Sequence, residues 1–235
     1  MGLQRECMSH QIRQILEKRI VSGELKPGDR LLELEIAREF NTSQTPVREA
    51  FEALNTQRLV ESIPYRGTYV RAISSREMQE AYAVRGVLEQ LAAELAAPLL
   101  QGNIADLRAI QEALREAAAQ GNVEDYAFQN EQFHRTIILH AQNQMLQEAW
   151  LNLGFETRVR ILMSKHLDPN LLARAAEHDP VLNALEKGDG VAAGKFLRRH
   201  SEKCSQRWLA RMAFEQELNG SPPEDGQHVS ASILS

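Results

Sequence analysis

The chain has 235 residues, with 27 Lys or Arg against 32 Asp or Glu and a formal net charge of −5. This length accommodates two domains, and the hydrophobic and charged fractions are typical of a soluble globular protein. No apolar run is long enough to cross a bilayer, and the N-terminal MGLQRECMSH has no apolar core like that of a signal peptide. Cys7 and Cys204 lack CxxC spacing and fit a reducing environment, so we expect a cytoplasmic protein without membrane contact.

Three helices are predicted between residues 10 and 59. The first is short, carries Ile12, Leu16 and Ile20 on one face, and ends at Gly23 before a turn, LKPGDRL. The other two are joined by a tight turn at Asn41, a residue type that tolerates the left-handed conformation. Each has one apolar face, formed by Leu34, Ile36, Ala37 and Phe40 in one helix and by Val47, Ala50, Phe51 and Leu54 in the other. This pattern predicts a helix-turn-helix, with an ordinary helical hairpin as the alternative.

The second helix of this pair begins with side chains suited to reading a DNA major groove. Ser43 or Thr45 can cap the helix, and Pro46 fits its first turn. Gln44, Thr45 and Arg48 are expected on its outer face near the start, where short polar groups and one guanidinium can reach base edges.

Two β-prone runs follow, at residues 59–63 and 68–73, around a turn built on Pro64 and Gly67. Tyr65 and Arg66 are expected at the tip of this hairpin, where they can contact a backbone phosphate or the minor groove. A helix pair followed by such a hairpin is a winged helix-turn-helix.

The string TPVREAFEALNTQRLVESIPYRGTYV, preceded by VSGELKPGDRL, resembles the DNA-binding domain of the GntR family of bacterial transcription regulators. The resemblance covers residues 10–73 and implies a homodimer that binds double-stranded DNA at a pseudo-palindromic operator. Leu34 and Gln44 depart from it, because many members carry arginines there. Residues 1–73 are nearly neutral and the acidity lies in the remainder, so attraction to phosphates must come from placed basic side chains and from dimerisation.

From residue 74 onward the chain is predicted to be almost wholly helical. Ser74 and Glu77 form a capping box, and Pro98 is expected to end or kink the first helix. The predicted helices span residues 75–97, 104–120, 123–141, 144–165, 177–187 and 190–215. We therefore predict a mainly α protein with a winged helix-turn-helix domain at 1–73, an all-α helical bundle at 74–218 and a disordered tail at 219–235.

Polar side chains fall on helix faces that are predicted to be buried. Asn130 and His134 lie one turn apart on one such face, His200 lies on another, and His178 begins a helix. Since a buried imidazole needs a partner, a hydrogen bond to a carbonyl explains any one of these histidines. Together, an oxygen donor and three inward histidines form a plausible set of ligands for a divalent metal.

The segments NEQFHRTII, AEHDPVLNALEKGD and FLRRHSEKC resemble the FCD effector domain of the FadR-like subfamily, in which an Asp and three His hold a metal at the floor of a ligand cavity. The resemblance assigns the ligands to Asn130, His134, His178 and His200. It implies a divalent cofactor, zinc first, with nickel, iron or manganese as alternatives. Asn130 departs from the usual carboxylate. A neutral amide is a weaker ligand and leaves the site one unit more positive, which favours an anionic ligand.

Arginine is suited to bidentate recognition of a carboxylate. Arg85 and Arg158 are the candidates for binding a small carboxylate effector, with a solvated or ion-paired position as the alternative for each. Arg135 is expected to be such a surface residue.

The sequence thus predicts a DNA-binding transcription regulator, and favours a repressor over an activator. Its helical domain is expected to bind a small organic acid through a metal, and this binding is expected to change operator affinity. Two alternatives stay open. One is a metal-dependent hydrolase or lyase, against which we find no well-placed carboxylate base beside the predicted ligand positions. The other is a constitutive DNA-binding dimer whose metal is structural.

Overall fold

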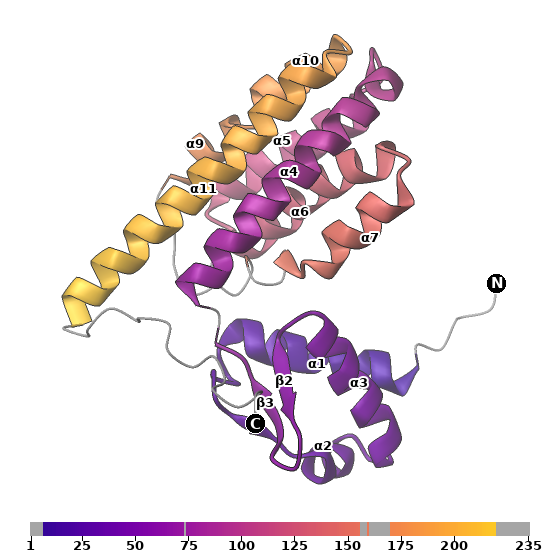
Figure 1. The fold of residues 1–235 in the computed structure, drawn as a ribbon, viewed down its shortest axis with the longest axis vertical. Helices are drawn as coiled ribbons and strands as arrows, with labels where there is room; N and C mark the ends of the chain where they lie inside the picture. The colour runs from indigo at the N-terminus through magenta and orange to yellow at the C-terminus, as the bar shows by residue number, and fades with distance from the viewer. Residues whose placement is uncertain (1–6, 73, 156–158, 160–169, 220–235) are drawn as a thin grey trace, which may run out of the picture.

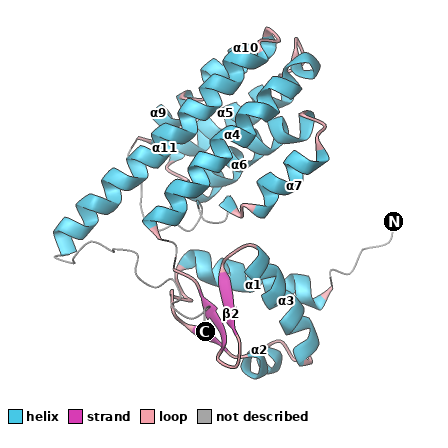
Figure 2. Ribbon diagram, viewed as in Figure 1, coloured by secondary structure: helices cyan, strands magenta, loops and turns pink. Residues whose placement is uncertain are grey.

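The computed structural model describes residues 7–72, 74–155, 159 and 170–219. The chain forms two lobes, one built from the N-terminal helices and three short strands and the other from helices alone (Figures 1 and 2). This confirms the predicted mainly α fold class. Residue 73 and residues 220–235 lie outside the described residues, and so does the predicted disordered tail beyond Asn219. Within the described ranges, no helix is long and apolar enough to span a membrane.

The N-terminal lobe contains a helix-turn-helix. Helix α1 (Met8–Ser22) packs on α3 (Gln44–Thr56), and α2 (Glu33–Glu39) precedes α3. Asn41 adopts φ +49 in the turn between α2 and α3, as predicted. The core of this lobe is apolar and consists of Ile12, Leu16, Ile20, Leu31, Ile36, Ala37, Val47, Ala50, Phe51, Leu54, Leu59, Val60 and Val70. The prediction for Leu34 was wrong. Its side chain is 49% exposed, because it lies on the outer face of α2.

The wing is a three-stranded antiparallel sheet in the order β1-β3-β2. β2 (Val60–Ile63) and β3 (Gly67–Val70) form the predicted hairpin, in which Val60 pairs with Val70 and Ile63 with Gly67. The third strand, β1 (Arg30–Leu31), lies where a turn was predicted. A two-residue strand has no periodicity that a sequence pattern can show, and pairing with β3 alone creates it.

The C-terminal lobe consists of helices. Their bounds are α4 (Ser75–Leu100), α5 (Ala105–Gln120), α6 (Val123–His140), α7 (Gln144–Asn152), α9 (Leu171–Ala176), α10 (Asp179–Glu186) and α11 (Gly190–Asn219). Ser74 accepts a hydrogen bond from the Glu77 amide, which confirms the predicted cap. Helix α4 continues past Pro98 and buries Leu100 in its last turn, so the predicted end of this helix at residue 97 was wrong. The predicted helix 144–165 was also wrong, since α7 ends at Asn152 and Gly154 has φ +56.

Helices α4 and α11 run side by side and make the most extensive contact in the lobe (Figure 1). Glycines in α11 permit this close approach. A Cβ atom at Gly190 would stand 2.8 Å from Glu94 Cα, and one at Gly194 would stand 2.9 Å from the Gln90 carbonyl oxygen. The main core between α4, α6, α10 and α11 contains Ala93, Ala96, Phe133, Ile137, Val181, Leu185, Ala193 and Leu197. This packing holds three histidines from three different segments together.

Candidate functional site

Three buried histidines meet inside the C-terminal lobe. His134 lies on α6, His178 immediately precedes α10, and His200 lies on α11. One ligand atom from each lies within 4.8 Å of the other two. The His178 ring stacks on Phe133 at a centroid distance of 4.2 Å, which fixes its orientation. The structure therefore brings together three of the four predicted metal ligands.

Each of these histidines has a side-chain oxygen close to its δ nitrogen, as a hydrogen bond for His178 and His200 and as an ion-pair contact without hydrogen-bond geometry for His134. His134 Nδ1 is 3.0 Å from Glu89 Oε1, His178 Nδ1 is 3.2 Å from Gln111 Oε1, and His200 Nδ1 is 3.0 Å from Glu177 Oε2. Such partners fix the ring orientation and the tautomer and leave the ε nitrogen available for a metal, as is usual for histidine ligands.

The ε nitrogens of His134 and His178 are buried and have no hydrogen-bond partner among the described residues. An unpaired buried polar atom is costly, and a metal ion between the rings would remove that cost. The residues present therefore fit a divalent metal, and imidazole nitrogens suit zinc and its neighbours in the transition series.

The electrostatics of the centre favour neutral imidazoles at two of the three positions. Burial, together with the charge of Arg85, lowers the pKa of His134 to about 4. Burial and the nearby His200 hold the pKa of His178 well below its ordinary value. Burial also opposes charge on His200, but Cys204 and Glu177 outweigh it and raise the pKa of His200 to about 9. His134 and His178 are therefore already in the neutral state that metal coordination requires.

Arg85 lies beside the centre but is engaged by a carboxylate. Its Nε donates to Glu89 Oε1 at 2.6 Å, and both side chains are almost fully buried. The Trp150 indole N–H donates to the same oxygen at 3.2 Å, and the Arg85 guanidinium lies 4.3 Å from the Phe155 ring centre. Arg85, Glu89 and Trp150 thus connect α4 and α7 to the His134 ring.

The other two predicted residues of the centre have different outcomes. Asn130 is half-buried on α6, one turn before His134, and no hydrogen bond among the described residues joins it to the three histidines. Arg158 lies outside the described residues. Arg135 is a surface residue 3.8 Å from Glu131, as predicted.

The sequence reading missed the groups that support the histidines. It found no carboxylate beside the ligands, and this was wrong, since Glu89 and Glu177 both contact them. Both residues are distant in sequence from the histidines that they support, so no local pattern shows the contact. Gln111 had a usable signal, because it lies between Leu107 and Leu114 on the apolar face of α5.

The predicted DNA-reading residues gather on one exposed face of the N-terminal lobe. Gln44, Thr45 and Arg48 are exposed in the first turns of α3. Arg48 Nε donates to Glu33 at 2.7 Å, and its Nη2 donates to Gln44 Oε1 at 3.3 Å. Exposed ion pairs of this kind contribute little to stability, so the guanidinium can exchange Glu33 for DNA at small cost.

Tyr65 and Arg66 form the tip of the wing. Tyr65 is fully exposed with φ +63 in the turn between β2 and β3, and Arg66 is exposed beside it. The Tyr69 hydroxyl donates to the Arg66 carbonyl at 3.0 Å and braces the turn. The wing tip therefore presents an aromatic ring and a cation to solvent.

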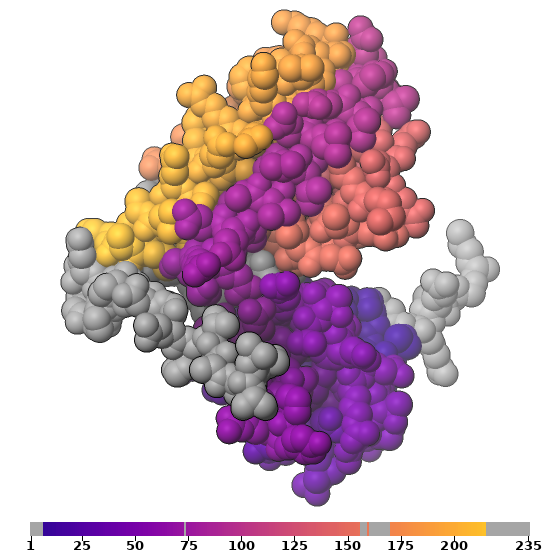
Figure 3. Space-filling model, in the orientation of Figure 1, coloured from indigo at the N-terminus to yellow at the C-terminus, as the bar shows by residue number. Residues whose placement is uncertain are grey.

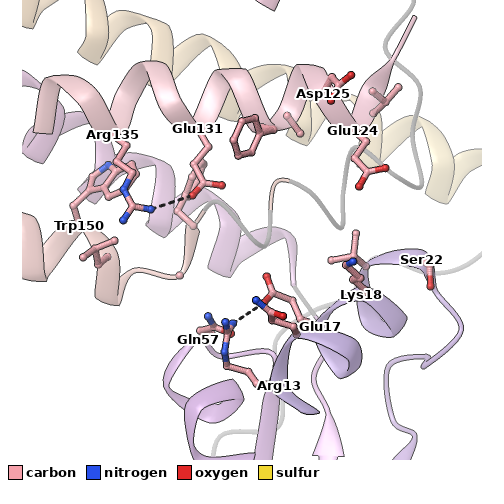
Figure 4. A pocket seen from close by; sticks show the side chains of 18 residues that line it. Arg13, Glu17, Lys18, Ser22, Gln57, Glu124, Asp125, Glu131, Arg135 and Trp150 are labelled. Carbon is pink, nitrogen blue, oxygen red and sulfur yellow. Dashed lines mark hydrogen bonds and ion pairs between the residues drawn. The ribbon is translucent and has the colours of Figure 1, made fainter. Parts of the chain in front are cut away.

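A cleft of about 1090 Å³ separates the two lobes. Figure 4 shows Arg13, Glu17 and Lys18 of α1 on one side and Glu131 and Arg135 of α6 on the other. Trp150 also lines the cleft, so the residue that contacts Glu89 beside the histidines reaches the boundary between the lobes.

A winged helix-turn-helix joined to a helical bundle with a buried histidine centre defines a class of DNA-binding regulators. Residues 8–70 match the family described as bacterial regulatory proteins, gntR family, and residues 80–203 match the FCD domain. The chain belongs to the gntR family of bacterial regulatory proteins, in its group with an FCD domain.

Two relatives agree with this assignment, and a solved structure has a similar fold. The chain is 36% identical to a probable D-xylose utilization operon transcriptional repressor of Paenarthrobacter nicotinovorans, over 84% of this chain and 87% of that protein. It is 32% identical to the gluconate operon transcriptional repressor of Bacillus subtilis, over 83% and 84%. Its fold is similar to that of E. coli McbR/YncC, with a TM-score of 0.73 at 23% identity, over 88% and 99%. The chain is a DNA-binding transcription regulator and not an enzyme, as predicted.

Proposed function

We propose that this protein is a cytoplasmic repressor whose dimer releases or binds a pseudo-palindromic operator in response to a small carboxylate, which binds at a divalent metal in the C-terminal lobe. The observation that carries this proposal is the convergence of three buried imidazoles, each with a side-chain oxygen beside Nδ1, and the two ε nitrogens of His134 and His178 that have no hydrogen-bond partner among the described residues. His134, His178 and His200 would hold the metal, with zinc favoured and nickel, iron or manganese as alternatives.

The charge of the centre supports an anionic effector. When bound, the metal supplies a double positive charge and an open coordination position. Asn130 is neutral where the family has a carboxylate, so this position does not offset the charge of the metal. The charge of Arg85 is already balanced by Glu89, so Arg85 can contribute hydrogen-bond donors to a carboxylate but no excess charge. A carboxylate reaching this position gains charge-assisted hydrogen bonds in a low-dielectric interior. The relatives named above control operons for a sugar and for a sugar acid, so a small hydroxy acid is the first class to test.

A chain of contacts links the centre to the DNA-reading lobe. Glu89 contacts both His134 and the indole of Trp150 on α7. Helix α7 ends at Asn152, and Gly154, two residues beyond it, lies with its backbone against Gln57, the residue that caps the C-terminal end of α3. An effector that shifts Glu89 would therefore move a contact at the base of the recognition helix. The effector can change operator affinity only to the extent that it binds more tightly to one relative arrangement of the dimer's two DNA-reading lobes than to another.

Exposed aliphatic side chains on α4 support the homodimer. Val84, Val87, Leu91 and Leu95 recur at helical spacing and are each 41–51% exposed. Figure 3 shows α4 beside α11 at the surface of the C-terminal lobe. A continuous apolar stripe on a soluble protein marks an interaction surface, and a twofold contact lets each copy cover the same stripe of the other.

The test is an operator titration with the full-length protein. An operator is selected from random duplexes, and affinity is measured by fluorescence anisotropy at fixed salt with metal-loaded protein. Gluconate and other small hydroxy acids form one panel, and uncharged sugars of the same size, including D-xylose, form the other. We expect at least one acid to change operator affinity and the uncharged sugars to be inert. A response to an uncharged sugar alone would overturn the carboxylate assignment, and no response to either panel would favour the constitutive dimer.

A further inference from the structure

Cys204 lies one turn beyond His200 on α11, at the edge of the three-histidine centre. Its Sγ atom is 3.6 Å from His200 Nε2, and the thiol is half-buried. Arg207 Nη2 donates a hydrogen bond to the sulfur at 3.1 Å. Because Glu177 engages His200 at Nδ1, the sulfur stands beside the one ring nitrogen that remains for a metal.

The sulfur–nitrogen separation matches that of two ligands on one ion. With bonds of about 2.3 Å to sulfur and about 2.1 Å to nitrogen, a tetrahedral zinc ion holds the two atoms about 3.6 Å apart. Ligand atoms of Glu177, His200 and Cys204 also lie within 4.8 Å of one another. Cys204 is not part of the group formed by the three histidines, so coordination together with all of them requires a rotation of its side chain about χ1.

The chemistry of the remaining donors gives the reason for a fourth ligand. As metal ligands, three imidazoles and the Asn130 amide would all be neutral donors, so the negative charge nearest to a divalent ion would lie outside its ligands, on Glu89 and Glu177 behind the rings of His134 and His200. Uncompensated charge in such a site is costly. A thiolate removes one unit of that charge, as the carboxylate usual at position 130 would do.

We propose that Cys204 is a ligand of the metal, with its thiolate binding the same ion as His200 and the thiol proton passing to solvent. This proposal rests on the metal centre proposed above. It makes the centre a mixed nitrogen–sulfur site that selects zinc over manganese or magnesium, because soft thiolates favour zinc. It also places a ligand next to Arg207, whose guanidinium donates hydrogen bonds to the Cys204 sulfur and to Glu177.

The experiment is a titration of chelator-stripped full-length protein with cobalt(II), followed by absorption spectroscopy. Wild type should develop an intense near-ultraviolet sulfur-to-cobalt band together with weaker visible bands of a tetrahedral site. Cys204→Ser should lose the near-ultraviolet band and keep the visible bands. It should bind zinc at least about tenfold more weakly, because losing a direct ligand costs no less than losing a residue that supports one. Cys7→Ser is the matched control, because Cys7 is exposed before α1, and it should keep both sets of bands.

The outcomes separate this proposal from the one on which it rests. Visible bands without the near-ultraviolet band in wild type would remove Cys204 from the site and leave the histidine centre standing. The absence of any cobalt spectrum in wild type would remove both. If Cys204→Ser does not fold, the alkylation rate of Cys204 by iodoacetamide in the Cys7→Ser background decides. Zinc should block alkylation, and an unchanged rate would overturn the proposal.

Discussion

The backbone of Gly154, just beyond α7, lies against the carbonyl of Gln57 at the end of α3. A Cβ atom at Gly154 would stand 2.6 Å from the Gln57 oxygen, a distance that no ordinary contact reaches. This contact joins the turn after α7, the helix that carries Trp150, to the C-terminal end of α3, the recognition helix. The contact involves backbone on both sides, so it cannot be relieved by turning a flexible side chain.

Gly154→Ala should therefore separate the lobes and alter operator affinity. The alanine pays about 1–2 kcal/mol for its left-handed backbone and forces Gln57 away as well. Gly121→Ala is the control, because Gly121 has φ +66 and nothing within 4 Å of an added Cβ. Both variants should lose thermal stability, while only Gly154→Ala should change the operator Kd. Equal Kd values for the two variants would mean that the Gly154 contact carries no coupling.

Arg48→Ala should weaken operator binding by about 1–3 kcal/mol and leave the oligomeric state intact. Arg48 is exposed on the face of α3 with Gln44 and Thr45, and its ion pair with Glu33 can be exchanged for DNA. Arg108→Ala is the control, since Arg108 is also exposed and ion-paired, with Glu186 in the other lobe. The measurement is a gel-shift titration at two salt concentrations. An Arg48→Ala titration that overlays the Arg108→Ala titration would remove Arg48 from the interface.

The parts that could be predicted from the sequence are those set by local pattern. Asn41 in its left-handed turn, the Ser74 cap and the helical spacing around His134 and His200 all depend on neighbours within a few residues. The parts that could not be predicted depend on packing between distant segments. Gln111 meets His178 across 67 positions and Trp150 meets Glu89 across 61, and nothing local encodes those meetings.

The prediction that Leu34 is buried was wrong for a related reason. Its spacing from Ile36 and Phe40 fits an apolar face, but α2 is so short that one turn decides which side faces the core. Helix α2 buries Ile36 and Ala37 against α3, and that leaves Leu34 in solvent.

Gln111→Met should lower metal affinity while leaving the fold intact. Gln111 holds His178 at Nδ1 and also donates to the Ala175 carbonyl at 2.7 Å, so the variant frees the ring to turn. Loss of such a supporting partner costs about 10–100-fold in metal affinity. Gln120→Met, on the exposed end of the same helix, is the matched control. Competition with a chromogenic zinc chelator measures both variants, and equal affinities would show that the Gln111 contact does not orient the ligand.

The metal-free protein should lose stability as the pH falls below about 6.5. His134 has a folded pKa of about 4 against an ordinary value of 6.5, so the unfolded chain takes up a proton first. The free energy of unfolding therefore falls as the pH drops from 6.5 to 4, by up to about 3 kcal/mol from this residue. Urea titrations of chelator-treated protein at pH 7 and pH 5 should show the loss, and His134→Gln should reduce it. His140→Gln, at the half-buried end of the same helix, should not.

If the protein forms the dimer proposed above, Leu91→Asp should convert it to a monomer with a folded C-terminal lobe. Leu91 is 43% exposed in the aliphatic stripe of α4, so a carboxylate there costs little in the isolated chain and much in an apolar interface. Leu139→Asp is the control, because Leu139 is 51% exposed on α6, away from the stripe. Sedimentation should give a monomer for Leu91→Asp and a dimer for wild type and Leu139→Asp. Operator affinity should fall in the monomer, since one reading head meets only one half-site. A Leu91→Asp protein that stays dimeric would place the dimer interface on another surface.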